Sequence, residues 1–174
     1  MKNEDKIRTC CFFGHRNIKE TCELENKLYT VIEELIVNKG VTAFLFGSRS
    51  QFDSFCLKTV TRLKERFSHI KRIYVRAEYP YIDDTYLQYL LTKYEYTYYP
   101  ERIINSGKAV YIERNYEMID RSNYCIVYYD EKYSPAIRKK GKNTLSSYQP
   151  KSGTKSAYEY AIKKDREIIN IFSV

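Results

Sequence analysis

Short apolar runs and longer segments with helical periodicity alternate along the first half of the chain. Residues 7–13 form an apolar run that ends at Gly14, and residues 41–46 form a second run that ends at Gly47. Each run predicts a buried strand followed by a turn. Between the two runs, apolar residues recur at helical spacing over positions 24–36, which predicts an amphipathic helix.

Polar residues that precede the helical segments predict where the helices begin. Asn17, with Glu20 three positions later, fits an N-cap signature, so we expect the first helix to start there. Gly40 suits the left-handed position just past the end of that helix. Ser50 with Asp53 fits the same signature for a second helix, whose apolar positions keep the helical period up to residue 67.

The second half continues the alternation, with one stretch that is hard to interpret. Eight tyrosines between positions 79 and 99 follow no clean period, and Pro80 and Pro100 punctuate them, so we expect a short helix and loops. We expect these tyrosines to cover the edge of the sheet, with stacking against a ligand ring as the alternative. The other predicted elements are strands at 70–75, 123–129 and 167–172, helices at 111–121 and 152–164, and a loop at 130–152.

Strands that alternate with helices predict an α/β fold. Such a chain forms a mainly parallel central sheet with helices on both faces, which is a Rossmann-like three-layer sandwich. A length of 174 residues suits one domain, so we expect residues 1–174 to form a single domain.

Composition indicates the cellular compartment of the protein and the state of its cysteines. No apolar run is long enough to span a bilayer, and residues 1–6 lack the apolar stretch of a secretory signal, so we expect a cytoplasmic protein without a membrane partner. The five cysteines have no C-x-x-C spacing and no nearby histidine, which argues against zinc. Cys10, Cys11 and Cys125 fall within strand-like runs, where a free thiol behaves as a small buried hydrophobe.

The charge of the chain indicates an anionic partner. The formal net charge is +8, and positions 132–158 contain no acidic residue. We expect this basic loop to act as a lid over an anionic ligand, with contact to nucleic acid as the alternative. Its cationic side chains, besides Lys132, are Arg138, Lys139, Lys140, Lys142, Lys151 and Lys155.

Three glycine-containing turns are candidates for binding phosphate. In open α/β sheets, ligands bind beyond the carboxyl ends of the strands, and a glycine turn before a helix lets backbone N–H groups approach a phosphate. The pattern is neither a G-x-G-x-x-G fingerprint nor a P-loop. The three turns are Gly14-His15-Arg16, Gly47-Ser48-Arg49-Ser50 and Ser152-Gly153-Thr154.

Charged side chains beside these turns extend the candidate site. Arg16 and Arg49 suit bidentate contacts with phosphate or carboxylate, against a surface salt bridge as the plain alternative. His15 is a candidate acid, base or stacking partner, although a lone histidine is more often structural. Asp53 is a further candidate contact near the crevice, against a role in starting the second helix.

The ordered motifs resemble a known family. Residues 113–118 (ERNYEM) and 120–127 (DRSNYCIV) look like the R-x-x-x-M helix and following strand of the Lonely-guy phosphoribohydrolases. Together with the three turns, they make the chain similar to the SLOG superfamily, closest to its YpsA-like branch and more distantly to the DprA/Smf DNA-processing proteins. The resemblance covers nearly the whole chain. It implies a Rossmann-like fold that binds nucleotides or signals such as ADP-ribose derivatives, with Arg114 and Asn115 at the site.

The chain departs from the hydrolase pattern. In that branch, an arginine matching Arg114 and a glutamate three residues after the G-T pair cleave an N-glycosidic bond, but Ala157 occupies the glutamate position here. An oxocarbenium-like transition state needs a nearby carboxylate or general base, so its loss favours binding over catalysis. Glu159 is close in sequence, but Ser156 with Glu159 fits a capping box, which is the role that we expect for it. Asp53, Asp120 and Asp130 are candidate replacement carboxylates near the crevice, against a solvated position for Asp120 as the plain alternative.

We therefore expect a binding module that holds a nucleotide or nucleotide-derived, ADP-ribose-like ligand at the carboxyl ends of the strands, for sensing or regulation. One alternative is a nucleoside-monophosphate phosphoribohydrolase with Arg114 as a catalytic residue. The second alternative, which ranks below the first, is DprA-like binding of single-stranded nucleic acid. The motifs call for no cofactor and no metal, and a homodimer stays open.

Overall fold

Six parallel strands form one sheet at the centre of the molecule. The computed structural model describes residues 7–47, 49–104, 107–133 and 152–172. The strands are β1 (Arg8–Gly14), β2 (Val41–Phe46), β3 (Lys71–Val75), β4 (Tyr96–Tyr98), β5 (Tyr124–Tyr128) and β6 (Glu167–Asn170). Their order across the sheet is β4-β3-β2-β1-β5-β6, and all five neighbouring pairs are parallel. The predicted α/β class and parallel sheet are confirmed.

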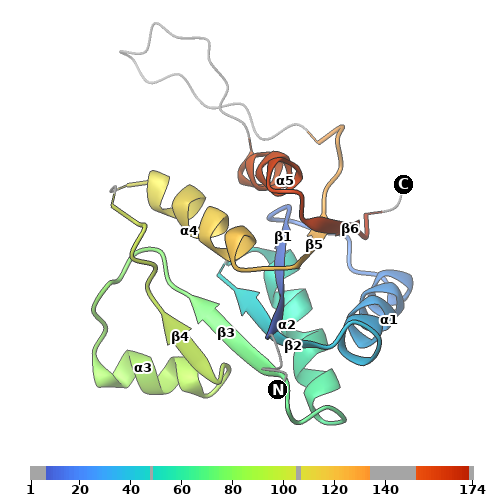
Figure 1. The fold of residues 1–174 in the computed structure, drawn as a ribbon, viewed down its shortest axis with the longest axis horizontal. Helices are drawn as coiled ribbons and strands as arrows, with labels where there is room; N and C mark the ends of the chain where they lie inside the picture. Colours follow the sequence, from blue (N-terminus) through green and yellow to red (C-terminus); the bar gives the residue numbers. More distant parts are fainter. Residues whose placement is uncertain (1–6, 48, 105–106, 134–151, 173–174) are drawn as a thin grey trace, which may run out of the picture.

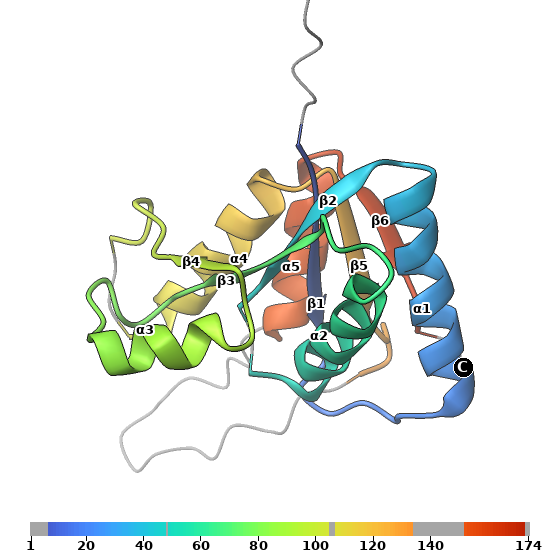
Figure 2. The ribbon, with the colours of Figure 1, turned by 90° about the horizontal axis from the view of Figure 1, so that it is seen from below.

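Helices cover both faces of the sheet, as the three-layer prediction requires (Figures 1 and 2). One core layer packs α1, α2 and α3 against the sheet, and the other packs α4 and α5 against the opposite face. The helices are α1 (Cys22–Val37), α2 (Gln51–Lys64), α3 (Asp84–Leu91), α4 (Ala109–Asp120) and α5 (Gly153–Lys163).

Strand β1 shows how the sequence builds both core layers. Successive side chains of a strand point to opposite faces, and a central parallel strand is buried on both. Cys10 and Phe12 accordingly belong to the layer under α1 and α2, whereas Cys11 and Phe13 belong to the layer under α4 and α5. The Sγ atoms of Cys11 and Cys125 lie 3.5 Å apart as buried free thiols, as we expected for these cysteines.

The order in which strands are added to the sheet reverses at β1. The strands from β1 to β4 succeed one another towards one edge, and β5 and β6 lie on the other side of β1. A ligand crevice forms outside the carboxyl ends of the strands at such a switch point, because the connections diverge there. The fold therefore places the turns that follow β1, β2 and β5 around one opening.

The predicted N-cap of α1 is wrong, and that of α2 is confirmed. Helix α1 begins at Cys22, because the hydroxyl of Thr21 accepts a hydrogen bond from the N–H of Leu24 at 3.1 Å. Asn17 lies outside the helix. Ser50 caps α2 by accepting from the N–H of Asp53 at 3.1 Å, and Gly40 has φ 67° just past the end of α1.

The tyrosine-rich stretch contains a strand that the sequence analysis missed. The short helix expected there is α3, but residues 96–98 add β4 to the edge of the sheet. Of its residues, Tyr96 is exposed and Thr97 is buried, a pattern too short to be recognised by its period. Within the described residues, no helix is long and apolar enough to cross a membrane.

Candidate functional site

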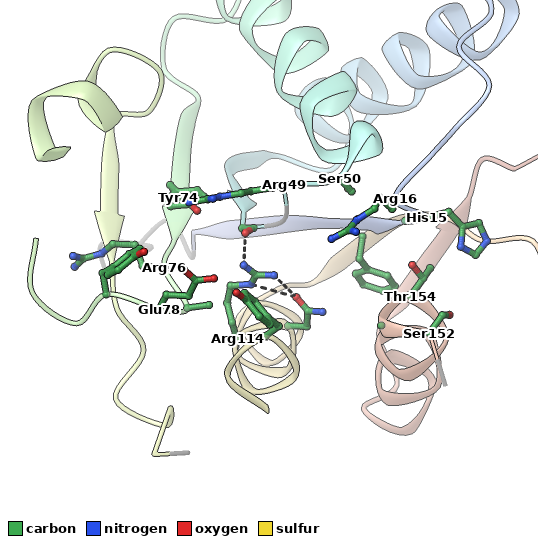
Figure 3. A pocket seen from close by; sticks show the side chains of 18 of the residues that line it. His15, Arg16, Arg49, Ser50, Tyr74, Arg76, Glu78, Arg114, Ser152 and Thr154 are labelled. Atoms are coloured by element: carbon green, nitrogen blue, oxygen red, sulfur yellow. Dashed lines mark hydrogen bonds between the residues drawn. The ribbon is translucent and has the colours of Figure 1, made fainter. Parts of the chain in front are cut away.

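A cavity of about 510 Å³ opens at the carboxyl ends of β1, β2 and β3, beside the first turn of α5 (Figure 3). Ten of the twelve predicted ligand contacts line it. They are Gly14, His15, Arg16, Gly47, Arg49, Arg114, Asn115, Ser152, Gly153 and Thr154. Ser48 lies outside the described residues, as do Arg138, Lys139, Lys140, Lys142 and Lys151 of the basic loop. Asp53 is buried and does not line the cavity.

Arg114 is the buried cation of the site. Its side chain comes from α4 and is only 6% exposed. Nη1 donates to the carbonyl oxygen of Gly47, and Nε and Nη2 approach Oδ1 of Asn115 at 3.4 and 3.3 Å. Burial lowers the pKa of Arg114, while the negative charges of Asp53 and Glu78 act in the opposite direction. Arg114 is therefore held in place by the protein itself, at the wall of the cavity.

Two of the predicted glycines are required by packing. A Cβ atom on Gly47 would lie 2.8 Å from Cδ of Arg114, and one on Gly14 would lie 2.4 Å from the ring of Phe52. Both positions need glycine because a neighbouring side chain passes over the backbone. This differs from the predicted reason, which was close approach by a phosphate.

The N-terminus of α5 is the part of the wall best suited to an anion. Ser152 caps the helix by accepting from the N–H of Lys155 at 3.1 Å. Helical geometry leaves the N–H groups of Gly153 and Thr154 without an intrahelical acceptor, and the helix dipole adds positive potential at this end. A Cβ atom on Gly153 would meet nothing within 4 Å, so the backbone here borders open space.

His15 lies beside this helix end and presents a donor with no partner (Figure 3). Its side chain is 3% exposed, and Nε2 accepts a hydrogen bond from the N–H of Asp130 at 2.9 Å. Burial lowers the pKa of His15, so the ring is neutral at pH 7 and carries its proton on Nδ1. Among the described residues, that Nδ1 atom has no hydrogen-bond partner. The ring stacks on Tyr133, with the centroids 4.1 Å apart.

Sequence analysis missed the residues that follow β3 and part of the aromatic side of the cavity. Arg76 and Glu78 come directly after β3, so the same rule that selected the turns after β1 and β2 would have found them. Tyr79 and Tyr86 belong to the tyrosine-rich stretch, for which stacking against a ligand ring was the alternative. The other tyrosines of the cavity come from separate segments and had no comparable signal. The tyrosines that line the cavity are Tyr74, Tyr79, Tyr86, Tyr111 and Tyr133.

Arg49 is tied to this aromatic side. The phenol of Tyr74, through an electrostatic interaction and a hydrogen bond, raises the pKa of Arg49, and burial raises the pKa of Tyr74. Arg49 thus remains a cation at the cavity, opposite the end that holds His15 (Figure 3). Of the eight tyrosines between positions 79 and 99, Tyr79 and Tyr86 border the cavity, so these two do more than cover the sheet edge.

The residues considered as replacement carboxylates do not line the cavity. Ala157 is buried in the core between α5 and the sheet. Ser156 and Glu159 lie inside α5, whose cap is Ser152, so the predicted capping box is wrong. Asp120 pairs with Arg102 and accepts from the hydroxyl of Tyr160 at 2.9 Å, which gives it a structural role.

Within the described parts of the chain, no three histidine, cysteine, aspartate or glutamate side chains are grouped as metal ligands would be. The arrangement instead offers cations, backbone N–H donors and aromatic rings. These groups suit an anionic ligand that also carries a ring.

Comparison with known proteins supports the fold. No protein-family profile matches the chain, and no curated protein sequence resembles it closely enough to be a relative. A solved structure of DNA processing protein A from Helicobacter pylori, described for its single-stranded DNA binding mode, has a similar fold, with a TM-score of 0.54 and 15% sequence identity. The similarity covers 92% of this chain and 63% of that chain.

This likeness supports the fold that the resemblance implies. The chain has a Rossmann-like fold similar to that of DNA processing protein A. The finer assignment to the YpsA-like branch has no support from the comparisons. At 15% identity, the likeness concerns the fold alone.

Proposed function

We propose that the cavity binds a nucleotide through its phosphate. The observation that carries this proposal is the meeting of three kinds of anion donor at one opening. These are the N-terminus of α5 at Gly153 and Thr154, the exposed Arg16, and the unpartnered Nδ1 of the buried His15. Each donor alone is common in proteins, but together they line one cavity with N–H groups and positive charge that a phosphate can accept from.

The size and lining of the cavity support a small, nucleotide-derived ligand. A volume of about 510 Å³ lies within the usual range for small-molecule sites. The tyrosines on the side away from α5 offer faces for a base, and the arginines balance phosphate charge. A ligand of the ADP-ribose type, which the YpsA-like resemblance suggests, has phosphate, ribose and base in one molecule. Its binding would serve sensing or regulation.

Gly153 provides a direct test by thermal shift with AMP, ADP-ribose and NAD. A bound nucleotide should stabilise the wild type by about 2.7 kcal/mol at a hundredfold excess over its Kd. Gly153→Asp should abolish this response, because its carboxylate repels phosphate at the first turn of α5. Gly153→Ala is the matched control and should keep the response, since its Cβ meets open space. No response to any nucleotide, or an unchanged response in Gly153→Asp, would refute the proposal.

Single-stranded DNA is the second candidate ligand, and it is the one that the comparison favours. The structurally similar protein from Helicobacter pylori was described for its single-stranded DNA binding mode. The net charge of +8 and the tyrosines at the cavity also suit a strand whose bases stack on aromatic rings. Fluorescence anisotropy with a labelled single strand tests it, with excess AMP as competitor. Binding that AMP displaces would put the strand in this cavity.

A further inference from the structure

Glu78 places a carboxylate in a cavity that is otherwise lined by cations and N–H donors. Of the described residues that line the cavity, it is the one with a carboxylate, among the cations Arg16, Arg49, Arg76 and Arg114. It follows the carboxyl end of β3 and is exposed. A second cavity of about 530 Å³ also borders Glu78. A carboxylate in that position repels phosphate, and its presence needs an explanation.

Charge balance with Arg114 does not require Glu78. Arg114 faces the buried Asp53, which is 3% exposed and acts on it electrostatically more than Glu78 does. The guanidinium also donates to the carbonyl oxygen of Gly47 and lies near Oδ1 of Asn115. Glu78 itself makes no hydrogen bond or ion pair with any residue in the described part of the chain. Both of its carboxylate oxygens are therefore available to a ligand that donates hydrogen bonds.

The order of groups along the cavity places Glu78 away from the phosphate end (Figure 3). Ser152, Thr154 and His15 lie at one end, Glu78 and Arg76 lie towards the other, and Arg114 lies between them. A nucleotide-derived ligand with phosphate on α5 extends its sugar past Arg114. The hydroxyl groups of ribose are donors, and two neighbouring hydroxyls match the two oxygens of one carboxylate.

We propose that Glu78 binds the ribose hydroxyls of the ligand and makes the cavity selective for ribonucleotides over 2′-deoxyribonucleotides. This inference rests on the proposed function, because it requires a nucleotide in the cavity. It deepens that function by naming the ligand class. It also separates the two candidate ligands, since DNA lacks the 2′-hydroxyl group.

Binding of matched ribo and deoxy nucleotides tests the inference. The dissociation constants of AMP, 2′-deoxy-AMP and ADP-ribose are measured by isothermal titration calorimetry for the wild type and for Glu78→Gln. The wild type should bind AMP about tenfold more tightly than 2′-deoxy-AMP, because a hydrogen bond to a charged group is lost in the deoxy compound. Glu78→Gln should bind the two with nearly equal affinity and still bind phosphate.

Controls separate this inference from the proposed function. Glu65→Gln removes the same charge from an exposed residue at the end of α2, outside the cavity, and should keep the tenfold preference. If Glu78 only balanced charge, Glu78→Gln would change the affinity for both nucleotides by the same factor. Equal binding of AMP and 2′-deoxy-AMP by the wild type would overturn the ribose contact alone. Absence of binding by all three nucleotides would overturn both proposals.

Discussion

At the scale of single residues, the sequence predicts which residues line the cavity better than it predicts the contacts that each residue makes. Arg114 was expected as a ligand contact, and it lines the cavity, but its donors already serve Gly47 and Asn115. Gly47 was expected to admit a phosphate, yet the structure uses it to admit the side chain of Arg114. These roles depend on which side chain from α4 reaches the turn after β2. No local sequence pattern predicts this contact, because the two segments are far apart in the chain.

Removing Arg114 should therefore lower stability more than its place at the cavity suggests. Arg114→Ala removes a buried guanidinium that donates to the carbonyl oxygen of Gly47, which should lower the free energy of unfolding by about 2 kcal/mol. Chemical denaturation with urea measures the change. Arg16→Ala is the control, since an exposed arginine should contribute less than about 0.5 kcal/mol. A similar small loss in both variants would contradict the structural role of Arg114.

His15 should make stability depend on pH. Its folded pKa lies below the ordinary value of 6.5, because burial disfavours the charged ring. The unfolded state then binds more protons as the pH falls, so the free energy of unfolding should decrease from pH 6.5 down to the folded pKa. Protonation also removes the acceptor of the Asp130 N–H group.

Urea denaturation of the wild type and His15→Phe between pH 7.5 and 5 measures this effect. The aromatic replacement keeps a ring against Tyr133 and removes the titrating group, so the difference between the two proteins should change with pH. The chain has two histidines, and His69→Gln is the control that should keep the wild-type pH dependence of stability. A parallel pH profile for His15→Phe would count against the buried neutral ring.

At the scale of elements, the hydrophobic period predicts the long and buried helices and strands. It fails where a strand is short, and it does not choose between two residues that could both cap a helix. Strands β1, β2 and β5 are continuous apolar runs, so their positions were correct within one or two residues. Strand β4 has three residues, and its place at the edge is decided by pairing with β3, which no local pattern reveals. For α1, Asn17 and Thr21 both have side chains that suit an N-cap, and the hydroxyl of Thr21 is the one that accepts from the first turn of the helix.

The choice of cap is open to measurement. Thr21→Ala removes the side-chain acceptor of the Leu24 N–H group and should lower the free energy of unfolding by about 1 kcal/mol. Asn17→Ala should change it by less than about 0.5 kcal/mol, because Asn17 is exposed and lies outside the helix. Thermal or urea denaturation of the two variants compares them. The reverse order of effects would restore the cap that the sequence predicted.

At the scale of the whole molecule, the alternation of elements was enough to predict the sheet and the end of it that carries the site. Parallel strands place their carboxyl ends together, so turns far apart in sequence converge without any contact being known in advance. What the sequence analysis overlooked was the segment after β3, where Glu78 adds a carboxylate to a cavity that is otherwise lined by cations. The net charge of +8 describes the whole surface and does not identify this local acid.

The same net charge makes salt dependence the measurement that separates a small ligand from a strand. The affinity for single strands falls with salt, with a slope near −0.7 in log–log form for each phosphate neutralised. Among the residues that the structure describes, the cations that line the cavity are four arginines, and Arg114 is already bonded to the protein, so these residues can neutralise few phosphates.

We therefore expect a labelled single strand to bind weakly at physiological salt and with a shallow slope across a salt series in fluorescence anisotropy. Nucleotide binding should change little over the same series, because a buried N–H donor and a helix N-terminus are less screened than exposed lysines. Gly153→Asp, which should abolish nucleotide binding, serves as the control for binding outside the cavity. Tight strand binding with a steep slope that survives in this variant would mean that a basic surface, and not the cavity, is the main binding site of the protein.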